Sequence, residues 1–79
     1  MMVVEEQLKQ IIADQLGRKV EDLSIEAELV NDLGADSLDI VEIIVSIEET
    51  FGIKIEDAEY VELKILQELV ELIKFKIGK

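Results

Sequence analysis

The chain has 79 residues, a length that fits one small domain. It contains no cysteine and no histidine, which excludes disulfide bonds and the usual zinc sites, so aliphatic packing must hold the fold together. Its net charge of −11, from 19 acids against 8 bases, argues against binding to nucleic acid or to an anionic membrane surface and favours basic protein partners.

The sequence carries no sign of a signal peptide or of a membrane-spanning segment. Residues 1–10, MMVVEEQLKQ, include acids early and lack the apolar core of a signal peptide. The uninterrupted apolar runs are all short, whereas a membrane-spanning helix needs about 20 apolar residues. We therefore expect a cytoplasmic protein.

The first predicted element is a helix over residues 3–16. Aliphatic residues recur at helical spacing from Val4 to Leu16, and Gly17 is placed to end the helix. Residues 18–35 show no sustained period, which predicts a loop. Six aliphatic residues in this segment favour a loop that packs over the core; they are Val20, Leu23, Ile25, Leu29, Val30 and Leu33.

The strongest helical pattern covers residues 37–51, where apolar residues occupy more than half of the circumference and Gly52 is placed to end the helix. An apolar stripe much wider than about 100° indicates that the helix is nearly surrounded or meets a partner. Residues 57–77 continue at helical spacing, with Asp57 as the expected N-cap. Periodicity alone allows one helix over this range. With no strand signal, the chain is predicted to be an all-α bundle.

Acids and bases are separated along the chain. No Lys or Arg occurs from Val20 to Ile53, a span that holds 10 of the 19 acids. Like charges on one helix cost stability. The span is therefore either a solvated acidic face or a docking surface for cationic partners. Five of the acids lie on or beside the 37–51 helix: Asp36, Asp39, Glu42, Glu48 and Glu49.

Ser37 lies where the long loop becomes this helix. Asp36 is the expected N-cap, Ser37 the first helical residue, and Asp39 sits where its carboxylate can reach back to the cap. An ordinary helix start accounts for these residues. As a nucleophile Ser37 would need a base, and the chain has no histidine. As an acceptor it would hold a phosphate ester at a helix N-terminus, with Gly34 leaving room for the incoming group.

We expect no resident metal ion, although the nearby acids would suit a divalent cation during such a transfer. If Asn31 to Glu42 is counted as a twelve-residue calcium loop, Leu33 takes the third position and Asp36 the sixth. An EF-hand needs an oxygen ligand at the third position and glycine at the sixth, so the match fails.

The segment DLGADSLDIVEIIVSIEETFGIKI, residues 32–55, resembles the signature region of acyl carrier proteins of type II fatty-acid synthesis. The tripeptide DSL is weakly specific by itself. LGADSL followed by an aliphatic and acidic helix and then by FGI is strongly specific. The resemblance covers nearly the whole chain, so residues 1–79 are identified as one acyl-carrier domain. It implies a four-helix bundle with three long helices, a short third helix and a long packed loop between the first two helices.

The resemblance implies that Ser37 carries 4′-phosphopantetheine, transferred from coenzyme A by a separate phosphopantetheinyl transferase. The chain would then be a carrier and not an enzyme, and the prosthetic thiol would hold acyl intermediates of fatty-acid synthesis as thioesters. Asp36, beside the attachment point, would assist the metal-dependent modification. A carrier of this kind is expected to be a monomer.

The resemblance also implies two surfaces. The first would dock basic patches of the transferase and of fatty-acid synthesis enzymes; it consists of Asp36, Asp39, Glu42, Glu48, Glu49, Ile40, Ile44 and Val45. The second would shelter the acyl chain between helices; it consists of Leu38, Val41, Ile47, Leu63 and Leu66.

The chain departs from the family pattern after the FGI segment. The family's last two helices correspond to residues 57–62 and 65–77, but Glu56 replaces the usual proline and Ile65 replaces the usual Thr or Ser cap. A missing cap would cost about 1 kcal/mol and bring the two helices closer to continuous. The tail IKFKIGK is also unusually aliphatic and basic.

Two alternatives stay open. One is a specialised carrier, for example of polyketide or lipid A synthesis; peptidyl and D-alanyl carriers are a further possibility, although LGADSLD disfavours a peptidyl carrier. The other, in a different class, is an unmodified helical interaction module in which Ser37 is only part of a helix start.

Overall fold

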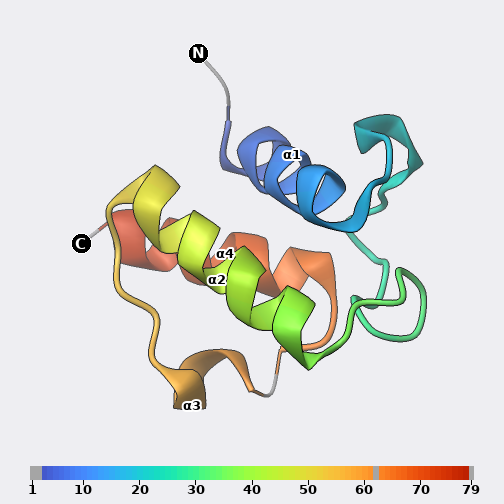
Figure 1. Ribbon diagram of the computed structural model, residues 1–79. Coiled ribbons are helices and arrows are strands. Elements are labelled where there is room, and N and C mark those ends of the chain that lie inside the picture. Colours follow the sequence, from blue (N-terminus) through green and yellow to red (C-terminus); the bar gives the residue numbers. More distant parts are fainter. Residues whose placement is uncertain (1–2, 62, 79) are drawn as a thin grey trace.

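The computed structural model describes residues 3–61 and 63–78. Over this part of the chain it contains α1 (Val4–Leu16), the 3₁₀-helix η1 (Val20–Asp22), α2 (Ser37–Phe51), α3 (Asp57–Tyr60) and α4 (Leu66–Ile77), as Figure 1 shows. The described residues form no strand and only one isolated antiparallel bridge, between Glu28 and Ile65. The predicted all-α architecture, with a short third helix and a long loop after the first helix, is confirmed.

The first two long helices agree with the sequence pattern. The predicted ranges 3–16 and 37–51 match α1 and α2 to within one residue, and Gly17 and Gly52 end them in the left-handed conformation. The expected cap of α3 is wrong by one position. Glu56 is the N-cap and Asp57 is the first helical residue, because the carboxylate of Glu59 reaches back and accepts from the Glu56 N–H at 2.8 Å. Residue 62, the predicted end of this helix, lies outside the described residues.

The start of α4 corrects the expectation of two nearly continuous helices. Ile65, the N-cap residue, is extended, with φ −113° and ψ 158°, and the helix begins at Leu66. The Leu66 N–H donates to the Ala27 carbonyl at 3.1 Å, and the Gln67 N–H donates to the Ile25 carbonyl at 2.7 Å. The long loop therefore satisfies the free N–H groups of α4 for which the sequence provides no polar cap.

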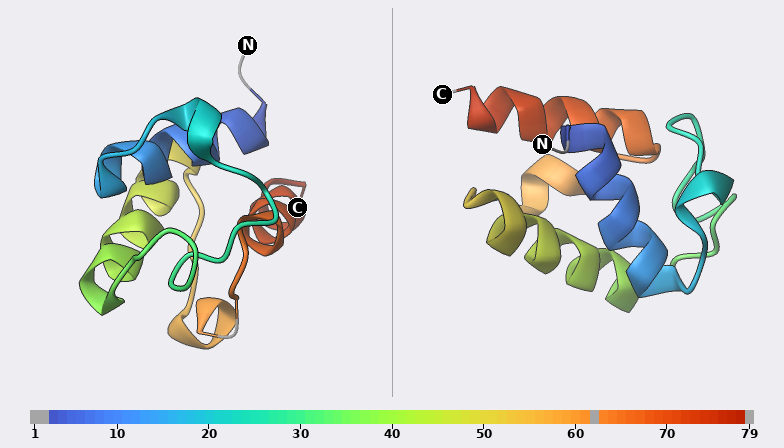
Figure 2. Two further views of the ribbon diagram at one scale, coloured as in Figure 1. Left: turned by 90° about the vertical axis from the view of Figure 1, so that its right-hand side faces the viewer. Right: turned by 90° about the horizontal axis from the view of Figure 1, so that it is seen from above.

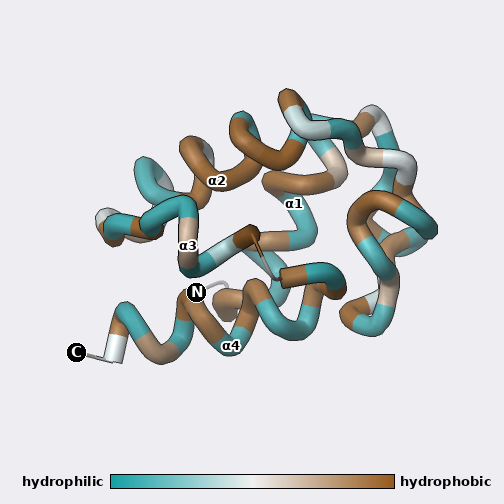
Figure 3. The backbone as a smooth tube through the Cα atoms, turned by 90° about the horizontal axis from the view of Figure 1, so that it is seen from below, coloured by the Kyte–Doolittle hydropathy of each residue, from teal (hydrophilic) through white to brown (hydrophobic). Residues whose placement is uncertain are grey.

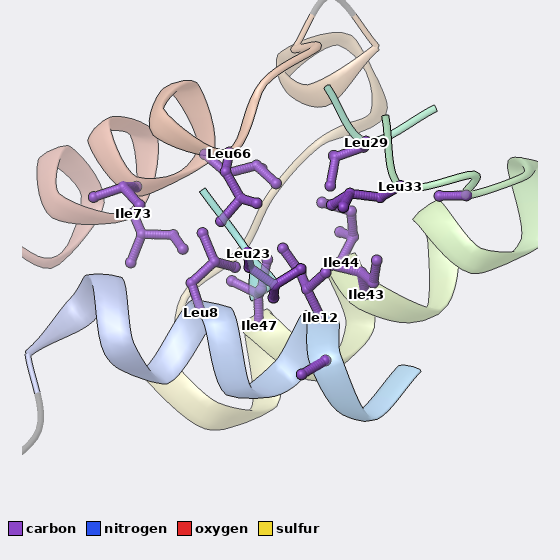
Figure 4. Packing of buried hydrophobic residues seen from close by; sticks show 14 of the residues in the cluster. Leu8, Ile12, Leu23, Leu29, Leu33, Ile43, Ile44, Ile47, Leu66 and Ile73 are labelled. Carbon is purple, nitrogen blue, oxygen red and sulfur yellow. The ribbon is translucent and has the colours of Figure 1, made fainter. Parts of the chain in front are cut away.

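The hydrophobic core lies between α1, α2, α4 and the long loop. In Figure 2, α1 lies across both α2 and α4, and it packs against each of them. The loop contributes Leu23, Leu29 and Leu33, all buried, so the prediction that it packs over the core is confirmed for these residues. Val30 differs, because its side chain is 60% exposed. The largest fully buried side chains, most of them labelled in Figure 4, are Leu8, Ile12, Ile43, Ile47, Leu66, Leu69 and Ile73.

Hydrophobic and hydrophilic segments alternate along each long helix, as Figure 3 shows. This alternation is what a helix with one face in a core requires. Among the described residues, no helix combines the length and the apolar character needed to cross a membrane.

Candidate functional site

Ser37 lies on the surface at the start of α2, and a reciprocal pair of carboxylates caps this helix. The Asp39 N–H donates to Oδ1 of Asp36 at 2.8 Å, and the Asp36 N–H donates to Oδ2 of Asp39 at 3.2 Å. The predicted cap is thus confirmed. Ser37 is the first helical residue and is exposed. Because the capping bonds come from Asp36 and Asp39, the Ser37 hydroxyl is not needed to cap the helix.

The loop that leads into Ser37 is fixed to the rest of the domain. Leu29, Leu33 and Ala35 are buried, and the Ala35 N–H donates to the Leu29 carbonyl at 2.9 Å. From the end of α1, the Arg18 guanidinium Nη2 donates to the Leu33 carbonyl at 3.2 Å. The buried side chains and these two hydrogen bonds therefore fix the backbone before Ser37, which places the serine at a defined point.

Gly34 has a different role from the expected one. A Cβ atom built at this position would meet no atom within 4 Å, so the space is open with or without a side chain. The backbone φ of +74° is the reason for glycine, because other residues rarely adopt this conformation.

The acids of α2 fall into two groups. Asp36, Glu42 and Glu49 are exposed, whereas Asp39 and Glu48 are half-buried. Oε2 of Glu48 accepts from the backbone N–H of Ile55 at 2.8 Å and so holds the connector between α2 and α3. Three of the five predicted docking acids therefore also have a structural role: Asp36 and Asp39 in the cap of α2, and Glu48 at this connector.

Gln15 of α1, which the sequence analysis did not single out, joins this acidic surface. Its Nε2 donates to Oδ1 of Asp39 at 3.3 Å and to Oε1 of Glu42. The Asp36 N–H, and then the Gln15 amide, lower the pKa of Asp39 below its ordinary value of 3.8. No local spacing rule connects Gln15 to residues on α2, so only the packing of the two helices could show this contact.

The apolar residues expected at the docking surface also divide into exposed and buried ones. Val45 is 45% exposed and Ile40 is partly buried. Ile44 is only 5% exposed and lies among the core side chains in Figure 4. Its assignment to the docking surface is therefore wrong. Ile44 precedes Ile47 by three positions, which puts both side chains on the core face of the helix.

A groove of about 760 Å³ begins at Ser37 and lies between the loop, α2 and α3. Two predicted acyl-pocket residues, Val41 and Leu63, line it, whereas Leu38, Ile47 and Leu66 do not. Ile47 and Leu66 have no exposed surface, and Leu38 is 64% exposed on the helix surface, so the predicted pocket is corrected in these three positions. The lining residues are Glu28, Leu29, Val30, Asn31, Ser37, Ile40, Val41, Tyr60, Val61, Leu63 and Lys64.

Tyr60, at the end of α3, is a groove residue that the sequence analysis did not assign to the site. It is half-buried. Partial burial, together with the nearby carboxylates of Asp57 and Glu48, raises the pKa of the Tyr60 phenol above its ordinary value of 10.0. The phenol end of the ring is therefore close to acids of α2 and α3, while the ring itself forms part of the groove wall.

Comparisons with known proteins agree with this geometry. A family model described as "Phosphopantetheine attachment site" matches residues 6–73. The chain is 47% identical over 75 residues to an acyl carrier protein of Nitratidesulfovibrio vulgaris (strain DSM 19637 / Miyazaki F), over 95% of this chain and 99% of that protein. The fold of this chain is similar to the solution structure of the apo doublet acyl carrier protein from prodigiosin biosynthesis, with a TM-score of 0.80 and 25% identity. That match covers 92% of this chain but only 35% of the doublet.

Proposed function

The chain belongs to the acyl carrier family that bears 4′-phosphopantetheine, and on this premise we propose that it carries the intermediates of fatty-acid biosynthesis on Ser37. Members of this family are carriers and not enzymes. The covalent cofactor supplies the thiol that forms the acyl thioester, which suits a chain that has no cysteine of its own.

The exposed position of Ser37 at the mouth of the groove is the observation that carries this proposal. The serine begins α2, the space around neighbouring Gly34 is open, and apolar residues line the groove that starts at Ser37. The cap formed by Asp36 and Asp39 would persist after modification, because it does not use the serine side chain.

Intact-mass spectrometry tests the attachment site directly. The protein is incubated with coenzyme A, magnesium and a broad-specificity phosphopantetheinyl transferase, beside Ser37→Ala as the control. We expect the mass of the parent to rise by one phosphopantetheine, and we expect Ser37→Ala to fold normally and to stay unmodified. A folded parent without the mass shift, or a modified Ser37→Ala, would contradict the proposal.

The proposed pathway rests on the segment at 32–55, with LGADSLD at its start. The prodigiosin doublet has a similar fold and favours a second candidate, a specialised carrier of secondary metabolism. A reconstituted type II fatty-acid elongation cycle separates the two. Repeated extension of a chain on the modified protein supports the fatty-acid role, whereas loading without any extension supports the specialised carrier.

We also propose that the exposed acids of α2 dock the basic patches of the transferase and of the pathway enzymes. Glu42 and Glu49 are exposed and carry no ion pair among the described residues. Reversing both, Glu42→Lys with Glu49→Lys, should raise the KM of a partner enzyme several-fold at low ionic strength and remove most of its salt dependence. Glu21→Lys with Glu26→Lys, an equal charge change at two exposed positions of the long loop, is the control. Equal effects from both pairs would show that net charge acts, and not a docking surface.

We further propose that the carrier works in the cytoplasm as a monomer. Light scattering coupled to size-exclusion chromatography tests the oligomeric state, and cell fractionation tests the location. A stable dimer at micromolar concentration would contradict the first expectation, and recovery with membranes would contradict the second.

A further inference from the structure

The groove at Ser37 is short along α2. The lining residues that α2 provides are Ser37, Ile40 and Val41, which span little more than one helical turn. Farther along the same helix, Ile44 is buried in the core and the Glu48 carboxylate is bound to the Ile55 N–H. An apolar chain that enters at Ser37 therefore lies against only this short stretch of α2.

Part of the groove lining belongs to the packed core. The lining includes Leu29, which is 4% exposed, and Leu63, which is partly buried. Ile47 and Leu66, which belong to the packed interior, have no exposed surface. A bound chain consequently stays in the groove and does not enter the interior without a rearrangement of packed side chains.

Tyr60 is the last residue of α3 and lies on the α3 side of the groove. Its ring lines the groove, and its phenol is near the Glu48 and Asp57 carboxylates. Glu48 follows Val41 on α2, so the ring lines the groove on the side toward this later part of the helix. Tyr60 is the largest side chain among the lining residues.

The segment that carries Tyr60 is held on two sides. The Glu48 carboxylate binds the Ile55 N–H before α3, and the Glu59 carboxylate pairs with Nζ of Lys76 at 2.9 Å. These contacts join α3 to α2 and to α4. The tyrosine thus belongs to a segment that contacts with α2 and α4 hold in place, and a barrier to a flexible chain must be held in this way.

We propose that Tyr60 is the end wall of the groove and sets the length of acyl chain that this carrier shelters. The inference rests on the proposed function of Ser37 and names a residue that determines which substrates the site holds. A short chain buries each added methylene against Ile40, Val41 and Leu63. A chain that has reached Tyr60 leaves every further methylene in water, where it adds no stability.

Chemical attachment of alkyl chains tests this inference without a transferase. The chain has no cysteine, so Ser37→Cys provides a single thiol. The thiolate attacks the sulfenyl sulfur of an alkyl methanethiosulfonate, the alkyl disulfide forms, and methanesulfinate leaves. Straight chains from two to about twelve carbons are attached in this way, and the melting temperature of each product is compared with that of the unmodified variant.

The expected result is a plateau that depends on the ring of Tyr60. In Ser37→Cys the melting temperature should rise with each methylene and then stop rising. Adding Tyr60→Ala should move the plateau to longer chains, because the groove then opens toward Glu48. Adding Tyr60→Phe should leave the plateau in place, because the ring is retained. Val61→Ala, at a groove residue that is 72% exposed, is the matched control and should also leave it in place.

Two results would overturn the inference: the same plateau in Tyr60→Ala as in the parent, or no dependence on chain length in any variant. If Tyr60→Ala is too unstable to measure, Tyr60→Leu shortens the side chain while preserving apolar packing, and it should give a smaller shift in the same direction. A failure of the transferase to modify Ser37 would refute the proposed function but would not affect the alkyl-chain result, so the two failures are distinguishable.

Discussion

The N-terminal N–H groups of α2 and of α4 find their hydrogen-bond partners in two different ways. Each helix begins with N–H groups that have no partner within the helix. At α2 the neighbours in sequence supply the partners, since Asp36 and Asp39 cap each other's N–H groups. At α4 the N-cap residue is Ile65, which has no polar side chain. The Glu68 carboxylate accepts from the Ile65 N–H, but the N–H groups of Leu66 and Gln67 donate to carbonyls of the long loop.

This difference decides which helix start is available for chemistry. A locally capped helix needs nothing packed over its first turn, so the start of α2 stays at the surface with Ser37 exposed. A helix capped by a distant segment must lie against that segment. The start of α4 is accordingly held by Ile25 and Ala27, and its first residue, Leu66, is fully buried.

Matched leucine substitutions at the two helix starts should show the largest difference in the free energy of unfolding. Leu66, the first residue of α4, is 0% exposed, whereas Leu38, the second residue of α2, is 64% exposed. Leu66→Ala should lower the free energy of unfolding by about 2–5 kcal/mol, because it leaves a cavity in the core. Leu38→Ala should change it by no more than about 0.5 kcal/mol. Urea denaturation of both variants checks this, and equal losses would contradict the contrast.

Removing the local cap of α2 should have an intermediate effect on the free energy of unfolding. Asp36→Ala removes the acceptor of the Asp39 N–H and should cost about 1 kcal/mol in unfolding free energy. Asp36→Asn keeps an acceptor oxygen at the same position and is the control. Thermal denaturation compares the two variants. If Asp36→Asn loses as much unfolding free energy as Asp36→Ala, the charge of Asp36 stabilises the helix and the hydrogen bond does not.

Acid should weaken the start of α4 through Glu68. Its carboxylate accepts from the N–H groups of Lys64 at 2.7 Å and Ile65 at 3.2 Å, and these bonds lower the pKa of Glu68 below its ordinary value of 4.5. The charged form is therefore favoured in the folded state. The resulting stability is present above pH 4.5 and is lost as the pH falls from there through the lower, folded pKa.

Glu68→Gln isolates this contribution from the general effect of acid on a chain of net charge −11. The glutamine keeps an acceptor oxygen but does not titrate. Unfolding free energies of parent and variant are measured by urea denaturation over a range of pH. We expect the difference between them to shrink as the pH falls through this window. A difference that stays constant would mean that the ionisation of Glu68 does not stabilise the fold.

A new local cap on α4 should have the smallest effect. Ile65→Thr places a hydroxyl at the N-cap, where Thr usually stabilises a helix. Here the Gln67 N–H already donates to the Ile25 carbonyl at 2.7 Å, so we expect a change within about 0.5 kcal/mol of that in Ile65→Val, the apolar control of the same shape. A gain of about 1 kcal/mol over valine in thermal denaturation would show that the loop leaves this N–H group poorly satisfied.

Local patterns predicted the parts of this protein that depend on nearby residues. The limits of α1 and α2, the stops at Gly17 and Gly52, and the cap formed by Asp36 and Asp39 all follow from spacing and side-chain chemistry within a few positions. Ser37 was identified as a candidate for the same reason, because the motif around it is continuous in sequence.

Residues brought in from elsewhere in the chain were missed or misplaced. Gln15 reaches Asp39 and Glu42 only because α1 packs against α2, and Tyr60 closes the groove only because α3 is joined to α2 and α4. Ile44, assigned to the surface, belongs to the core. A helical stripe shows that a residue is apolar but does not show which neighbouring element covers it.

The sequence by itself determined that the chain is helical, acidic and built around a serine at a capped helix start, because propensity, charge and capping act over a few residues. Only the tertiary structure decided where α4 begins, which apolar residues of α2 stay exposed and where the groove ends. Those features depend on contacts between segments far apart in the chain, such as Ile25 with Gln67, and their free energy is gained only once the core brings these segments together.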